Sequence, residues 1–111
     1  MNKKSEIKII VELDENKMPE KIEWEATDAD FEGLKEAKSL ILSLWDKKEN
    51  LTLGIDLWTK EMTVGEMNNH FHQIFLKMAD TFERSTQNTE AANMIRDFSS
   101  EFALKVKLDN R

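Results

Sequence analysis

The stretch that decides the fold runs from residue 51 to residue 84, LTLGIDLWTKEMTVGEMNNHFHQIFLKMADTFER. Residues 51–58 alternate between apolar and small or polar side chains, which predicts a β-strand. A helix is predicted to begin at Thr63, because Thr63 and Glu66 have the spacing of a capping box. Apolar residues then recur at helical spacing as far as Phe82. The stretch therefore joins a strand to an amphipathic helix through a short connection.

Upstream of this stretch, residues 5–14 and 21–26 also alternate with a period of two. The polar segment between them holds the only proline, so the two runs predict a β-hairpin with one charged face. Residues 34–48 predict a helix with a wide apolar arc, and Leu40 and Leu42 flank its central stripe. Two interpretations of that arc remain: a well-covered core element, or a dimer contact made by these two leucines.

Downstream, residues 85–89 predict a turn and residues 91–106 a last helix. The expected fold is α+β in the order ββαβαα. It would have a small, mostly antiparallel three-stranded sheet in the order 2-1-3, with helices packed on one face. A chain of 111 residues supports a single domain, 1–111.

Composition restricts the partners that the protein can have. The net charge is −6 and no lysine or arginine cluster is present, so binding to nucleic acid is not expected. No apolar run is long enough to span a bilayer, and charges interrupt the amino terminus where a secretory signal needs apolar residues. Cysteine is absent. We therefore expect a cytoplasmic protein whose acidic surface suits a basic protein partner or simply keeps the chain soluble.

Candidate chemistry is weak along the whole sequence. His70 and His72 are two residues apart, so on a helix they diverge by roughly 200°, and no shared metal site is expected. The acids at 28, 30 and 32 before Gly33 resemble the start of a calcium loop, but Ser39 stands where the bidentate glutamate should be. No nucleophile motif or phosphate-binding glycine loop appears. The sequence therefore predicts neither an enzyme nor a cofactor.

The three tryptophans are the candidates for buried or binding positions. Trp24 and Trp45 are expected in the core, whereas alternation places Trp58 on the outer face of its strand together with Asp56. Trp58 and Ile10 would then form an apolar patch on the wet face of the sheet, a possible partner surface. Its other members would be acidic: Glu12, Glu23, Glu25 and Asp56. The alternative is that the strand ends at Leu57 and that Trp58 folds back over the core.

Several strings identify a family. IDLWTKEM, FHQ and MADTFER in the opening stretch, KKSEIKIIVELDENKMPEKIEW at the start and MIRDFSSEFA near the end resemble the gliding-motility protein GldC family of Bacteroidetes-type bacteria. The resemblance implies a small cytoplasmic accessory protein of the gliding machinery, without enzymatic activity or cofactor, that acts through protein–protein interaction. The alternative function is a small, acidic, dimeric chaperone of the secretion type for a component of the apparatus.

Overall fold

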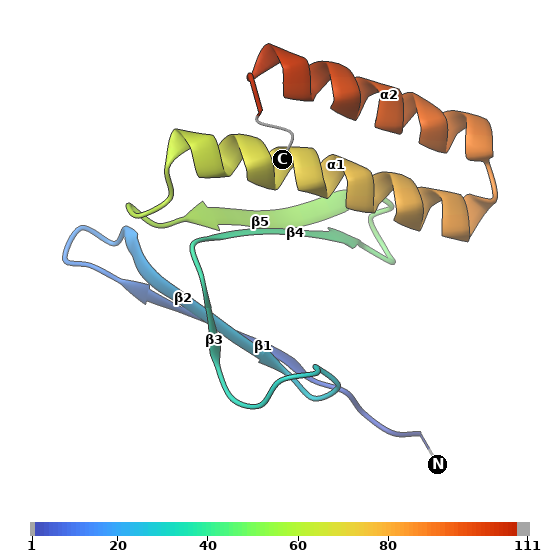
Figure 1. Ribbon diagram of the computed structural model, residues 1–111. Helices are drawn as coiled ribbons and strands as arrows, with labels where there is room; N and C mark the ends of the chain where they lie inside the picture. The colour runs from blue at the N-terminus through green and yellow to red at the C-terminus, as the bar shows by residue number, and fades with distance from the viewer. Residues whose placement is uncertain (1, 109–111) are drawn as a thin grey trace. The chain divides into compact units, whose positions relative to one another are not determined.

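The computed structural model describes residues 2–108. Within them, strands occupy the first part of the chain and two helices the second (Figure 1). The elements are β1 (Ile7–Leu13), β2 (Pro19–Ala26), β3 (Lys35–Ala37), β4 (Ser39–Trp45), β5 (Thr52–Trp58), α1 (Val64–Thr86) and α2 (Thr89–Lys105). Contacts group the chain into two compact units, one ending at Met62 and the other beginning at Thr63. The α+β class is confirmed, whereas a single domain over residues 1–111 stays a prediction.

β1 and β2 form the antiparallel hairpin that the alternation predicts. Ile9 pairs with Trp24 and Val11 with Ile22, so the apolar side chains of both strands share one face. The charged side chains share the opposite face. The register is regular from Ile7 and shifts only between Glu12 and Leu13, next to the turn.

Asp14 organises the turn between these strands. Its Oδ1 accepts hydrogen bonds from the backbone N–H groups of Asn16 at 2.8 Å and Met18 at 3.0 Å, and Lys17 takes a left-handed conformation with φ 63°. Lys60 Nζ lies 3.3 Å from Asp14 Oδ2. The hydrogen bond from Met18, with smaller contributions from Asn16 and Lys60, lowers the pKa of the Asp14 carboxyl from its ordinary value.

β3 extends the hairpin to three strands in the order β1-β2-β3. Ile22, in the central strand, is 1% exposed and pairs with Ala37 of β3. The rings of Trp24 and Phe31 meet edge to face, with their centroids 5.0 Å apart. Lys35 Nζ lies over the Phe31 ring, 4.8 Å from its centroid. The core of this sheet therefore lies on its apolar face, around Ile22 and Trp24.

The helix predicted over residues 34–48 is wrong. The chain takes the short strand β3 there and, after Lys38, enters β4. The alternating pattern in SLILSLW fits a strand as well as a helix, and a short apolar run does not distinguish the two. β5 decides the outcome by placing three aliphatic side chains opposite those of β4. The cross-strand pairs are Leu40 with Leu57, Leu42 with Ile55, and Leu44 with Leu53.

The predicted sheet order 2-1-3 is wrong for the same reason. β5, the expected third strand, pairs with β4 in a separate antiparallel sheet, so the order of elements is βββββαα. Asp46 organises the turn of this second hairpin, since its Oδ2 accepts from the N–H groups of Lys48 at 3.0 Å and Glu49 at 2.7 Å. Gly54 is required in β5, because a Cβ there would lie 2.7 Å from the carbonyl oxygen of Leu42.

α1 begins where the sequence predicts. Thr63 Oγ1 accepts from the N–H of Glu66, and Glu66 Oε1 accepts from the N–H of Thr63, each at 3.0 Å, which is the predicted capping box. The helix ends with Gln87 in the left-handed conformation at φ 59°. Asn88 then caps α2, because its Oδ1 accepts from the N–H of Ala91 at 3.0 Å.

α1 and α2 lie side by side and antiparallel (Figure 1). Their buried residues are small: Ala79, Ala92, Ser99 and Ala103. Ser99 Oγ donates to the backbone oxygen of His72 at 3.4 Å, so the helices approach closely there. Beside this contact, the ring of Phe75 meets those of Phe98 and Phe102 edge to face, with the ring centroids 5.2 Å apart in both pairs. Small residues thus allow the helices to touch, and aromatic rings fill the space beside them.

Arg96 joins the two helices through ionic hydrogen bonds. Its Nη2 donates to Glu83 Oε1 at 2.6 Å and to Asp80 Oδ1 at 2.9 Å, and its Nη1 donates to Asn93 Oδ1 at 2.8 Å. The hydrogen bond from Arg96, followed by one from Thr89, lowers the pKa of Glu83. The two acids in turn raise the pKa of Arg96. The bonds to Asp80 and Glu83 thus connect α2 to α1.

Candidate functional site

The charged face of the β1-β2-β3 sheet is the first candidate surface. Lys8 lies opposite Glu25, with Nζ 3.8 Å from Oε1, and Glu12 lies opposite Lys21. Lys21 Nζ in turn lies 3.8 Å from Glu23 Oε2 on the same strand. The side chains of these pairs remain partly accessible to water, so the pairs contribute little to stability. They give this face a pattern in which lysine and glutamate lie opposite each other across β1 and β2.

The middle row of this face differs from the rows beside it. Ile10, 40% exposed, lies opposite Glu23, which lies opposite Glu36 of β3. Like charges directly opposite each other across a sheet are unfavourable. An exposed isoleucine next to two facing acids is an arrangement that a basic and partly apolar partner would stabilise.

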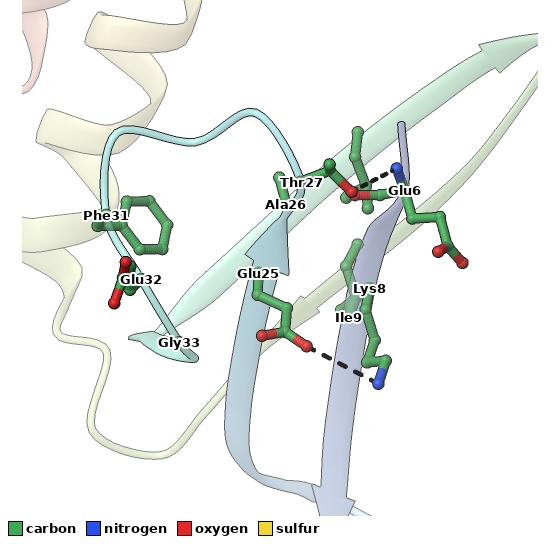
Figure 2. A pocket seen from close by; sticks show the side chains of 10 residues that line it. Glu6, Lys8, Ile9, Glu25, Ala26, Thr27, Phe31, Glu32 and Gly33 are labelled. Carbon is green, nitrogen blue, oxygen red and sulfur yellow. Dashed lines mark hydrogen bonds and ion pairs between the residues drawn. The ribbon is translucent and has the colours of Figure 1, made fainter. Parts of the chain in front are cut away.

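An open groove lies at the end of the hairpin, between its strands and the loop of residues 27–33 (Figure 2). It has a volume of about 740 Å³. Glu6, Glu25 and Glu32 line it with Lys8 as the cation, and Phe31 contributes an aromatic ring. With three carboxylates and one lysine, the lining of the groove is net acidic.

The β4–β5 hairpin is the second candidate surface. Trp45 and Trp58 lie on the same face of it, at opposite ends, because Trp45 pairs with Thr52 and Trp58 pairs with Ser39. They are 68% and 57% exposed. β5 includes Trp58, so the strand does not end at Leu57 as the fold-back alternative requires, and a role of Trp58 in a partner surface stays a prediction. The prediction that Trp45 belongs to the core is wrong, because strand alternation sends this ring to the same face as Trp58.

The predicted partner-surface residues fall into two groups. Ile10, Glu12, Glu23 and Glu25 share the charged face of the first sheet, whereas Asp56 and Trp58 belong to the second sheet. No backbone pairing among residues 2–108 joins these two groups into one sheet. The sequence had suggested one continuous patch because it predicted one continuous sheet.

Leu40 and Leu42, the predicted dimer contacts, lie on one face of β4 and not on opposite sides of a helix. Both are half-buried. The helical argument for a dimer contact at these leucines is therefore wrong. Sequence reasoning also missed Ile41 and Trp45 as surface residues, although the period-two pattern of SLILSLW could have indicated them.

The histidines and acids do not assemble into a metal centre. Over residues 2–108 the structure contains no group of three or more histidine and carboxylate side chains placed to hold a metal ion. His70 is half-buried, and its Nε2 has no hydrogen-bond partner in the described part of the chain. Asp28 of the acidic loop accepts a hydrogen bond from Ser5. None of the described helices is long and apolar enough to cross a membrane.

These features define a small α+β protein with two exposed surfaces, one charged with an isoleucine at its centre and one bearing two tryptophans. The family model described as gliding motility-associated protein GldC-like matches residues 19–108. The chain therefore belongs to the GldC-like family, as its sequence strings predicted. Comparison with curated proteins and with solved structures gives no match.

Proposed function

We propose that this protein is a non-catalytic accessory protein of the gliding motility machinery that acts in the cytoplasm by binding another protein of the machinery. Membership of the GldC-like family supports the connection to gliding. The observation that carries the binding role is the exposure of Trp45 and Trp58 on one face of the β4–β5 hairpin.

Exposed tryptophans are strong anchors for a protein partner. A tryptophan buries a large apolar area on binding and is enriched among the residues that dominate interface energies. Ile41, 40% exposed, lies between the two tryptophans on the same face and opposite Asp56. The face thus combines apolar anchors with one carboxylate, which suits a partner segment that carries an apolar residue next to a basic one.

The test uses gliding cells in which the gene is replaced by Trp58→Ala, Trp45→Ala or the double variant. Ser43→Ala on the same face of β4 is the matched control. We expect the double variant to fold and to bind the partner protein of the machinery at least about tenfold more weakly than the wild type does. Cells that carry it should glide poorly. The control should behave as wild type. Gliding that is unchanged after deletion of the gene would contradict the proposal.

A second candidate function is a chaperone that holds an apparatus component before export. It is supported by the opposite face of the same hairpin, where Leu44, Leu53 and Ile55 are 57%, 46% and 51% exposed. Apolar side chains that are accessible on both faces of a hairpin can bind unfolded chain segments.

The two functions differ in what the protein recognises. A chaperone would suppress aggregation of several unrelated unfolded proteins, whereas an accessory protein would bind one folded partner. Aggregation assays with and without Leu53→Ser distinguish them. Suppression that is absent for wild type, or unaffected by this variant, removes the chaperone function.

A further inference from the structure

β1 is an edge strand of the first sheet. Its position in the order β1-β2-β3 leaves one side of the strand without a backbone partner among residues 2–108. The strand is long, regular over most of its length and rich in β-branched residues, and it contains no proline. Such an edge pairs readily with another strand unless something blocks it. Ile7 and Leu13, the first and last residues of the strand, are 73% and 51% exposed.

The contacts of Glu6 show which backbone groups point away from β2. The N–H of Glu6 donates to Thr27 Oγ1, and the N–H of Thr27 donates to the carbonyl oxygen of Glu6, both at 3.0 Å. The backbone groups of Glu6 therefore face the β2 side. Because these groups alternate along an antiparallel strand, those of Ile7, Ile9 and Val11 face outward.

We propose that two copies of this protein associate through their β1 strands, which pair antiparallel about a two-fold axis at Ile10. In this register Ile9 faces Val11 of the second copy, and each can donate and accept a backbone hydrogen bond. The pairing joins two three-stranded sheets into one continuous sheet of six strands. This dimer is independent of the proposed role in gliding.

The occupant of the edge is identified by the charges of β1 itself. With Ile10 at the axis, Lys8 faces Glu12 of the second copy, and Glu12 faces Lys8 of the second copy. Within each copy Lys8 already lies opposite Glu25, and Glu12 opposite Lys21. Each charged row across the dimer then contains, in order, Glu25 and Lys8 of one copy followed by Glu12 and Lys21 of the other. The signs alternate at every step, which favours this pairing.

The apolar face is equally self-complementary. Ile7 meets Leu13 and Ile9 meets Val11 of the second copy, so apolar side chains lie only against apolar ones. A slip of one residue would turn apolar side chains toward the charged face. A slip of two residues would place Ile10 opposite Lys8 or opposite Glu12. β4 and β5 carry no pair of opposite charges that would select a register in this way.

The first test uses the absence of cysteine from the natural chain. Ile10 would form a pair without backbone hydrogen bonds across the axis, with Cα atoms about 4.5 Å apart, a separation that a disulfide accepts. Ile10→Cys should therefore form a disulfide-linked dimer under mild oxidation at micromolar concentration. Lys8→Cys is the matched control, because its two copies would lie at least about 13 Å apart.

We expect at least about tenfold more cross-linked dimer for Ile10→Cys than for Lys8→Cys, and efficient cross-linking when Lys8→Cys and Glu12→Cys are mixed. Equal cross-linking of Ile10→Cys and Glu90→Cys, which lies on α2, would overturn the proposal. So would strong cross-linking of Lys8→Cys alone, because it requires another register. Circular dichroism of each reduced variant confirms that the strands are intact.

The second test exchanges charges. Lys8→Glu and Glu12→Lys each place like charges across the axis, so each alone should weaken the dimer at least about tenfold in sedimentation equilibrium. An equimolar mixture restores both opposite-charge contacts and should form heterodimers with nearly wild-type affinity. Each substitution also changes a contact within its own copy, to Glu25 or to Lys21. That change is the same whether the variant is alone or in the mixture, so recovery in the mixture reports only the contacts between copies. A wild-type protein that stays monomeric at tens of micromolar, or a mixture without recovery, would refute the dimer.

Discussion

The strand unit that ends at Met62 and the helical hairpin that begins at Thr63 are specified in different ways. The helical hairpin is set by local signals: the capping box at Thr63, the left-handed Gln87 and the cap at Asn88. The strands depend on partners elsewhere in the chain, as β4 does on β5. The difference teaches that signals within each helix are enough to predict the helical part, whereas each strand can be predicted only together with the strand that pairs with it.

Two natural probes separate these units in an unfolding experiment. All three tryptophans, at 24, 45 and 58, precede Thr63, so tryptophan fluorescence reports the strand unit. Circular dichroism at a helix-sensitive wavelength reports α1 and α2. Coincident transitions by both probes would support the predicted single domain, and separate transitions would show two folding units.

The largest effect should come from Ile22→Ala in the strand unit. Ile22 is 1% exposed, and removal of a buried isoleucine side chain costs about 2–5 kcal/mol. We expect the free energy of unfolding measured by fluorescence to fall by that amount, so that the transition moves to a lower urea concentration. Met18→Ala, in the turn after β1 at a position that is 53% exposed, is the control and should have a small effect. Equal losses at both positions would contradict the assignment of the core to the sheet around Ile22.

Ala79→Leu tests the close approach of the helices. Ala79 in α1 is fully buried, so a larger side chain must push α2 away at a cost of about 1–3 kcal/mol. The free energy of unfolding measured by circular dichroism should fall by this amount. Lys77→Leu, which places the same leucine side chain at an exposed position of the same helix, is the control. If Ala79→Leu were neutral, the helices would have room that the structure does not show.

A smaller effect is expected from Thr63→Ala, which removes the capping box at the start of α1. Loss of an N-cap hydroxyl destabilises a helix by about 1 kcal/mol. Thr63→Ser keeps the accepting oxygen and should restore most of the stability. Measurement of both variants by urea unfolding separates the hydrogen bond from the rest of the side chain. Equal stability of Thr63→Ser and Thr63→Ala would contradict the capping role.

The smallest effects concern the dependence of stability on acidic pH. The pKa values of Asp14 and Glu83 are lowered in the folded state, so each carboxylate adds stability above its unfolded pKa of about 4. That stability is lost as the pH falls through the lower folded value. Asp14→Asn should flatten the acid dependence of the fluorescence transition, and Glu83→Gln that of the dichroism transition. If each variant changed both probes equally, the two units would unfold together.

The sequence predicts some elements well because the signals lie within them. The β1–β2 hairpin follows from alternation and a polar turn, and both helices follow from apolar periodicity and caps. Residues 34–45 fail because their short apolar run fits two periods, and only the pairing with β5 selects the strand. That single error also misplaced Trp45 and Leu42.

The candidate site follows the same rule. The predicted charged face around Ile10 is found because it depends only on alternation within one hairpin. Its union with Asp56 and Trp58 fails because it required the sheet order, which alternation does not contain. The exposure of Trp58 was predictable from its own strand, whereas that of Trp45 required knowledge that its segment is a strand.

In the described part of the chain, each extensive contact joins elements that are neighbours in sequence: β1 with β2, β2 with β3, β4 with β5 and α1 with α2. Chains rich in local contacts fold on the microsecond to millisecond scale, because little loop entropy is lost before contacts form. Each hairpin can also close as soon as its second member leaves the ribosome. The connectivity therefore favours rapid folding during synthesis, because the strands can pair before α1 has left the ribosome.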